Sequence, residues 1–212
     1  MLLRLLGPLL EEEVRWTEQD RRVEVFLSAA MHRRAEEVLR SEGIGDAPFA
    51  VVCPGGSSSP RWPAEKFGQI VARLVQIGFH ILIEGSSDER ELLSEVGRHA
   101  GQGGERAGVR VRTDPLGIFA ALLSRARLLL SNDSAPIHYA EALETPTVYF
   151  AQREKRIHSR PWGNRHIALF DGRANDVAAI EVEEVWRAVA GAPSRRVTNV
   201  SLTRQDIPDS GP

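Results

Sequence analysis

Three loops of the sequence bring small residues together with hydroxyl or carboxyl groups, and each follows a short apolar run. The first loop is PGGSSSPRWP (54–63). Its Gly55 and Gly56 let the backbone approach a ligand closely, and Ser57 and Ser58 add hydroxyl donors. Such a loop ahead of a helix is suited to phosphate oxygens. A flexible turn without a ligand is the alternative interpretation.

The second loop, EGSSDER (84–90), ends the next apolar run. Its Asp88 could accept hydrogen bonds from ribose hydroxyls. The alternative is purely structural, because Ser86 and Glu89 have the spacing of a capping box and acidic residues complement the N-terminus of a helix. The loop alone leaves both interpretations open.

The third loop is NDSAPIH (132–138), in which Asp133 and Ser134 precede an Ala-Pro helix start. His138 follows Ser134 by one helical turn, so the two side chains can face the same cleft. The structural alternative makes Asp133 or Ser134 a helix cap and His138 a packed helix residue. A catalytic triad is not favoured, because triad members normally come from separate elements and the motif GxSxG is absent.

The apolar runs alternate with helical patterns, which is typical of βαβ units. We expect strands at residues 48–53, 79–83, 109–111, 127–131, 147–150 and 166–170, with helices between them and a closing helix through residues 182–189. These elements predict an α/β fold with a Rossmann-like, doubly wound parallel sheet. Its strands would bring the three loops to one edge, where such sheets bind ligands.

The two ends of the chain differ from this alternating middle. Residues 1–46 contain one helical pattern, at 23–40, and no run of strands, so we expect a helical remnant or linker. Residues 47–191 form the predicted Rossmann-like domain. Residues 192–212 are polar without periodicity, which predicts a disordered tail.

Composition narrows the classes of partner. The chain has 212 residues and a formal net charge of −2 at pH 7, so it has no overall positive charge that would attract nucleic acid. The opening MLLRLLGPLL is too short to span a membrane and is not a convincing signal peptide.

The single cysteine, Cys53, excludes an intrachain disulfide and suits the cytoplasm. The six histidines are scattered and no acidic pair has the spacing of metal ligands, so we expect no metal or other cofactor.

Four motifs resemble glycosyltransferase family 9, the bacterial ADP-heptose:lipopolysaccharide heptosyltransferases. They are PGGSSSPRWPAEKF (54–67), EGSSDE (84–89), LGIFAALLSRARLLLSNDSAPIHYAEALETPTVYF (116–150) and RPWGNRH (160–166). The resemblance covers about residues 48–190. It implies a GT-B arrangement of two Rossmann-like domains, with residues 47–191 as the C-terminal, donor-binding half.

The resemblance also implies roles for individual residues. The diphosphate and sugar of an ADP-sugar would be held by Gly55, Gly56, Ser57, Ser58, Asp133, Ser134 and Ala135. Ser87 or Asp88 and the region of Leu116 would face the nucleoside, and His138 matches a histidine of the family. Arg61 is the cation nearest to the position where the family commonly has a lysine, since Pro60 stands at that position.

The family's first domain carries the acceptor pocket and the catalytic base, and residues 1–46 are too few to form it. We therefore expect a donor-binding half that works with a separate acceptor-domain chain or self-associates. The alternative is a non-catalytic nucleotide-sugar-binding module or a truncated fragment. An oxidoreductase or hydrolase is not expected, because the glycine fingerprint GxGxxG and the motif GxSxG are absent.

A basic loop follows the fifth expected strand. It could meet the diphosphate or an anionic lipid A core acceptor at the inner membrane, or it could simply be a solvated loop. Its cations are Arg153, Lys155, Arg156, Arg160 and Arg165.

Overall fold

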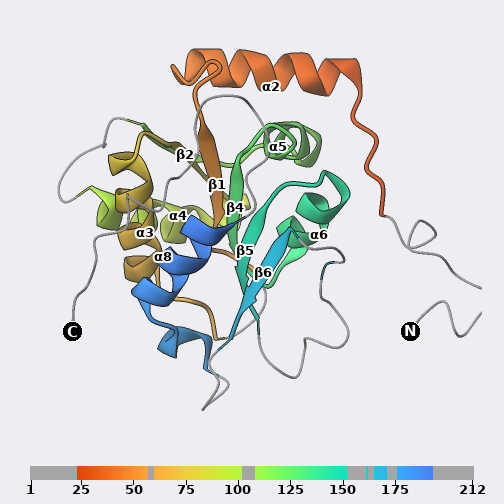
Figure 1. Ribbon diagram of the computed structural model, residues 1–212. Coiled ribbons are helices and arrows are strands. Elements are labelled where there is room, and N and C mark those ends of the chain that lie inside the picture. Colours follow the sequence, from red (N-terminus) through yellow and green to blue (C-terminus); the bar gives the residue numbers. More distant parts are fainter. Residues whose placement is uncertain are drawn as a thin grey trace, which may run out of the picture.

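The protein is built around one sheet of six parallel strands (Figure 1). The computed structural model describes residues 23–56, 60–101, 108–151, 161, 165–170 and 176–192. The strands are β1 (Phe49–Cys53), β2 (His80–Glu84), β3 (Val109–Arg112), β4 (Leu128–Asn132), β5 (Thr147–Phe150) and β6 (His166–Leu169). Their order across the sheet is β3-β2-β1-β4-β5-β6. The predicted Rossmann-like, doubly wound sheet is therefore confirmed.

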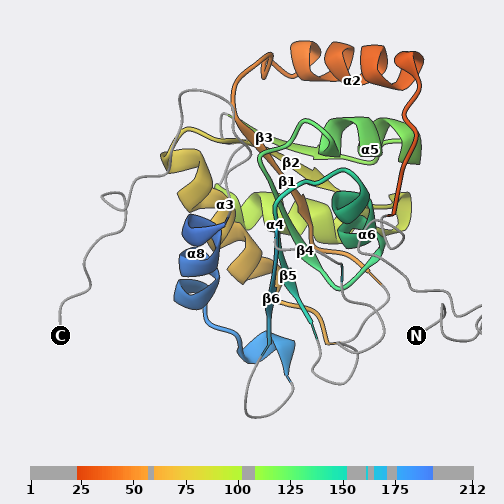
Figure 2. The ribbon, with the colours of Figure 1, turned by 45° about the vertical axis from the view of Figure 1, so that its right-hand side comes forward.

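Helices cover both faces of the sheet (Figures 1 and 2). One face carries α3 (Ala64–Gln76), α4 (Arg90–Ala100) and α8 (Val182–Gly191). The other carries α2 (Ala29–Ser41), α5 (Leu116–Leu123) and α6 (Ala135–Ala142). Two short 3₁₀ turns, η3 (Ser87–Glu89) and η4 (Val177–Ala179), precede α4 and α8.

Each helix layer packs a large hydrophobic core against its face of the sheet. Every residue of β1 and β4 is buried, as expected for central strands of a parallel sheet covered on both sides. In α3 the buried residues recur at helical spacing, so one face meets the sheet. They are Phe67, Gly68, Ile70, Val71 and Leu74.

The helix expected at residues 23–40 starts later, at Ala29. Ser28 caps it, because its side chain accepts a hydrogen bond from the Met31 amide at 3.2 Å. Its inner face, which includes Val38 and Leu39, packs into the core beside α5. The buried face of α2 thus belongs to the hydrophobic core on one face of the sheet. The domain boundaries at 46 and 191 stay predictions.

The strand order fixes where a ligand site can form. From β1 the chain passes to α3 on one face, and from β4 it passes to α6 on the opposite face. Because β1 and β4 are neighbours, their carboxyl ends border the crevice at which open α/β sheets bind ligands. The loops after β1, β2, β3 and β4 surround this crevice.

Some predicted features lie outside the described residues. They are Ser57 and Ser58, the tail from residue 193, and the basic loop except Arg165. Within the part of the chain that the structure describes, no helix is long and apolar enough to cross a membrane.

Candidate functional site

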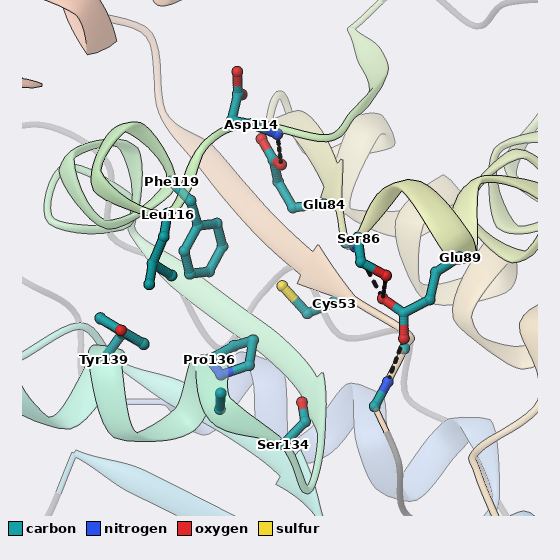
Figure 3. A pocket seen from close by; sticks show the side chains of 14 residues that line it. Cys53, Glu84, Ser86, Glu89, Asp114, Leu116, Phe119, Ser134, Pro136 and Tyr139 are labelled. Atoms are coloured by element: carbon teal, nitrogen blue, oxygen red, sulfur yellow. Dashed lines mark hydrogen bonds between the residues drawn. The ribbon is translucent and has the colours of Figure 1, made fainter.

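A cavity of about 490 Å³ lies at the carboxyl edge of the sheet (Figure 3). Its walls come from the loops after β1, β2, β3 and β4 and from the first turns of α5 and α6. The lining residues are Cys53, Gly55, Gly56, Glu84, Gly85, Ser86, Glu89, Asp114, Leu116, Phe119, Ser134, Ala135, Pro136 and Tyr139. The position is the one predicted from the three loops.

The glycine-rich loop requires glycine where it meets the cavity. Gly56 has φ +118, and a Cβ there would lie 2.8 Å from Cβ of Ser134. A Cβ on Gly55 would overlap the carboxylate of Glu89. Larger residues would therefore close the space between the loop, η3 and the start of α6.

Asn132, the last residue of β4, holds both ends of this loop. Its Nδ2 donates to the carbonyl of Pro54 at 2.6 Å, and its Oδ1 accepts from the amide of Trp62 at 3.1 Å. Asn132 is only 2% exposed, so these hydrogen bonds form in a region of low dielectric. The side chain therefore holds residues 54 and 62, at the two ends of the loop, close to the end of β4.

Ser134 occupies the N-cap position of α6, but its side chain makes no capping hydrogen bond. Its Oγ donates to the carbonyl of Asn132 at 3.2 Å and lies 3.5 Å from Oγ of Ser131. Ser134 and Ala135 line the cavity, so the positive end of the helix dipole borders it. This end of the cavity suits an anionic group.

Glu89 connects two walls of the cavity. Its Oε2 accepts from the amide and hydroxyl of Ser86, at 3.0 and 3.1 Å, which confirms the predicted capping box. Its Oε1 accepts from the amide of Gly56 at 2.7 Å. Burial alone would raise the pKa of Glu89, but these hydrogen bonds and the charge of Arg61 outweigh it, so the pKa lies below its ordinary value. Glu89 is therefore an ionised hydrogen-bond acceptor beside the glycine loop.

Glu84, the last residue of β2, is 2% exposed and lines the cavity. Its Oε2 accepts from the amide of Asp114 at 3.4 Å, whereas its Oε1 accepts no hydrogen bond from any described residue. Burial, followed by the charge of Asp114 and a hydrogen bond between the two side chains, raises the pKa of Glu84 to about 8. The carboxyl group is therefore mostly neutral at pH 7.

Arg112 explains why the neighbouring acid stays charged. It donates from Nε and Nη2 to the two oxygens of Asp114, at 2.7 and 2.9 Å. Burial opposes ionisation of Asp114, but this two-point contact dominates and its pKa lies below the ordinary value. Arg112 also pairs with Glu42, so the cation is shared and Glu84 is left without full compensation.

Apolar side chains form another side of the cavity. Figure 3 shows Leu116, Phe119 and Tyr139 on the side of the view opposite Ser86 and Glu89. The rings of Phe119 and Tyr139 meet edge to face with centroids 6.4 Å apart. A flat apolar ligand group fits such a surface better than a charged one.

Five of the predicted site residues line the cavity: Gly55, Gly56, Leu116, Ser134 and Ala135. The other described ones are not among its lining residues. Arg61 is exposed but close enough to Glu89 to affect its pKa. Ser87 and Asp88 are exposed on η3, and Asp133 is half-buried. The Nδ1 of His138 lies 3.7 Å from Oε2 of Glu141 on the next turn of α6.

Sequence reasoning missed three acids of the cavity: Glu84, Glu89 and Asp114. The sequence pattern assigns Glu89 only to the capping box and gives Asp114 no role in the site. A signal for Glu84 was present, because it is the single charged residue in the buried strand β2, HILIE. A charge in such a strand is rare without a specific role.

The cavity thus has three parts. One end, at Ser134 and Ala135, suits anions; one side is apolar; and the acid pair Glu84 and Asp114 lies between the apolar side and Glu89. Within the described ranges, no three His, Cys, Asp or Glu side chains gather as metal ligands. The prediction of a metal-independent site stays a prediction.

Comparisons with known proteins all point to the same family. The sequence model of glycosyltransferase family 9 (heptosyltransferase) matches residues 9–190. Lipopolysaccharide heptosyltransferase 3 of Escherichia coli is 27% identical over 151 residues, which are 68% of this chain and 42% of the relative. The chain spans about half the length of the relatives that it matches.

Solved structures share the fold. A glycosyltransferase family 9 protein from Veillonella parvula DSM 2008 superposes with a TM-score of 0.69 at 24% identity, over 79% of this chain and 52% of the other. The E. coli heptosyltransferase WaaC with ADP-2-deoxy-2-fluoro heptose gives a TM-score of 0.57 at 21% identity, over 68% and 43%.

Proposed function

The chain belongs to glycosyltransferase family 9, and from this premise we propose that its cavity binds the nucleotide part of an ADP-sugar donor. The observation that carries the proposal is the cavity between the carboxyl ends of β1 and β4, bordered by the glycine loop and the N-terminus of α6. Its fold is shared with the E. coli enzyme whose structure contains an ADP-heptose analogue. ADP-heptose is the donor that we propose.

The two sides of the cavity suggest how such a donor would lie. We place the diphosphate beside the glycine loop and at Ser134 and Ala135, where the helix dipole of α6 favours anions. The base would then lie against Leu116, Phe119 and Tyr139. The ribose would come near Glu89, an ionised acceptor between the two ends.

This arrangement can stabilise a leaving group. When the bond between the sugar and the diphosphate breaks, negative charge grows on the diphosphate. Oriented amides and a helix N-terminus stabilise that charge without reorganising. We propose that Arg61, whose charge acts on Glu89, assists.

Sugar transfer also needs an acceptor pocket and a base that removes a proton from the acceptor hydroxyl. We propose that another polypeptide segment supplies both, either in a separate chain or through self-association, and that the reaction serves lipopolysaccharide core synthesis in the cytoplasm. Contact with an anionic lipid A core acceptor would then involve the basic loop. The second candidate function is a module that binds nucleotide sugars without turnover. The observation that favours it is that the chain spans about half the length of the relatives that it matches.

Calorimetric titration with ADP, CDP and UDP tests the donor proposal. We expect the wild-type chain to bind ADP most tightly and Gly56→Ala to lose most of this affinity, because the added methyl group meets Ser134. Gly78→Ala is the matched control: its φ is also positive, at +92, but no atom lies within 4 Å of an added Cβ. Equal binding of the three nucleotides, or equal loss in both variants, would contradict the proposal.

A further inference from the structure

The buried carboxyl group of Glu84 has no role in the donor site as described above. It is 2% exposed, it lines the cavity, and its Oε1 accepts no hydrogen bond from any described residue. Leaving a buried polar atom without a partner costs free energy, so native proteins usually provide one. A ligand in the cavity is one way to supply it.

Charged neighbours do not remove the need for such a partner. The nearest cation to Oε1 is Nε of Arg112, at 3.8 Å, which is too long for a hydrogen bond. Arg112 already donates to Asp114 from Nε and Nη2 and pairs with Glu42 through Nη1. The guanidinium group is therefore committed to other carboxylates.

We propose that Glu84 reads the edge of the nucleobase, donating one hydrogen bond to it and accepting another through its carboxyl group. The proposal rests on the donor function proposed above and names the residue that would select the base. Adenine presents an amino donor beside a ring-nitrogen acceptor on its exposed edge. A carboxylic acid offers the complementary pair of one donor and one acceptor.

The position of Glu84 fits this role. In Figure 3, Glu84 and Asp114 lie at the edge of the cavity between the apolar side, with Leu116 and Phe119, and the side with Ser86 and Glu89. A base whose faces meet the apolar side chains would turn its polar edge toward the acid pair. Because the last torsion of a glutamate side chain is soft, the carboxyl group can rotate toward a ligand at little cost.

Only the neutral form of Glu84 can donate, so its surroundings decide whether the role is possible. Burial comes first, the charge of Asp114 second and a hydrogen bond between the Glu84 and Asp114 side chains third in raising its pKa to about 8, while Arg112 acts in the opposite direction. Donation to a base would exchange this hydrogen bond with Asp114 for one with the ligand. The titratable and charged groups around it are Cys53 on β1, Glu89 on η3, Arg110 and Arg112 on β3, Asp114 before α5, and Arg34 and Glu42 from α2 and its end. At pH 7 the group is mostly protonated, and it loses its donor as the pH rises through about 8.

The test compares ADP binding to the wild type, Glu84→Gln and Glu84→Leu between pH 7 and pH 9. We expect wild-type affinity to fall about tenfold over this range, because the donor is lost as the acid ionises. Glu84→Gln keeps one donor and one acceptor without titrating, so its affinity should match that of the wild type at pH 7 and stay level. Glu84→Leu should bind about tenfold more weakly than the wild type at pH 7.

A second ligand makes the test independent of the fold of any one variant. Purine riboside diphosphate lacks the amino group of adenine. Removing that group should weaken binding to the wild type and to Glu84→Gln but change little in Glu84→Leu, since the partner side chain is already gone. Circular dichroism of each variant checks that it is folded.

The outcomes separate the two proposals. If ADP binds and its affinity has the same pH dependence in the wild type and Glu84→Gln, or is unchanged in Glu84→Leu, Glu84 does not read the base and the donor function stands. If ADP does not bind to the folded wild type at all, both proposals fail.

Discussion

At the scale of single residues, the most unusual feature is an acid that keeps its proton. Glu84 sits at the end of a buried strand beside an Asp114 that Arg112 holds ionised. Two carboxyl groups this close are not both ionised at neutral pH without a large cost. The cavity therefore contains fewer charges than its composition indicates, which lessens its repulsion of a diphosphate.

This proton has a consequence for stability that does not involve a ligand. The folded protein binds it up to about pH 8, whereas the unfolded chain releases it near the ordinary value of 4.5. The free energy of unfolding contributed by Glu84 should therefore fall as pH rises from about 5 to about 8. Glu84→Gln removes this titration.

The measurement is urea unfolding of the wild type and Glu84→Gln at several pH values. The acids whose pKa is lowered, such as Asp114 and Glu89, act in the opposite direction in both proteins. The difference between the two proteins reports the titration of Glu84 together with its effect on Asp114. A difference that is constant between pH 5 and pH 8 would show that Glu84 is already ionised in the folded state.

The sequence predicted some site residues better than others, for a physical reason. Gly55, Gly56 and Ser134 belong to loops whose position follows from the βα alternation, and they line the cavity. Glu84 could not be predicted in the same way. Its protonation depends on Asp114 and Arg112, which reach it only through the pairing of β2 with β3.

At the scale of elements, Asn132 connects strand β4 to the glycine loop after β1. Asn132→Ala would remove both hydrogen bonds and leave the carbonyl of Pro54 and the amide of Trp62 without their buried partner. We expect a loss of about 2 kcal/mol in unfolding free energy and weaker ADP binding, because the ends of the loop are released.

Asn132→Asp is the informative companion variant. It keeps an acceptor for Trp62 but loses the donor to Pro54. It also places a negative charge near Ser134 and Ala135, at the end of the cavity that suits anions. Differential scanning calorimetry and ADP titration measure the two effects separately. If Asn132→Ala leaves both melting temperature and affinity unchanged, the bridge does not position the loop.

The elements themselves were largely predictable from local patterns. Strand β4 was expected at 127–131 and lies at Leu128–Asn132, and the capping box of Ser86 and Glu89 is present as predicted. The predicted start of the first helix was less accurate, since α2 begins at Ala29 rather than at residue 23. Its start is fixed by the cap at Ser28, which periodicity alone does not locate.

At the scale of the whole molecule, the described residues form a doubly wound sheet with its helices and a cavity at the carboxyl edge of the sheet, and the chain spans about half the length of the relatives that it matches. We propose that these residues contribute the donor-binding part of the reaction. The proximity that accelerates transfer requires an acceptor held on the opposite side of the cavity.

Locating the bound nucleotide tests this account most directly. We would titrate isotopically labelled chain with ADP and follow the backbone amide resonances by NMR. We expect the largest shifts on Gly55, Gly56, Gly85, Ser134 and Ala135, which line the cavity. Saturable binding of ADP with its largest shifts elsewhere in the sheet or on α8 would contradict the assignment of this cavity as the donor site.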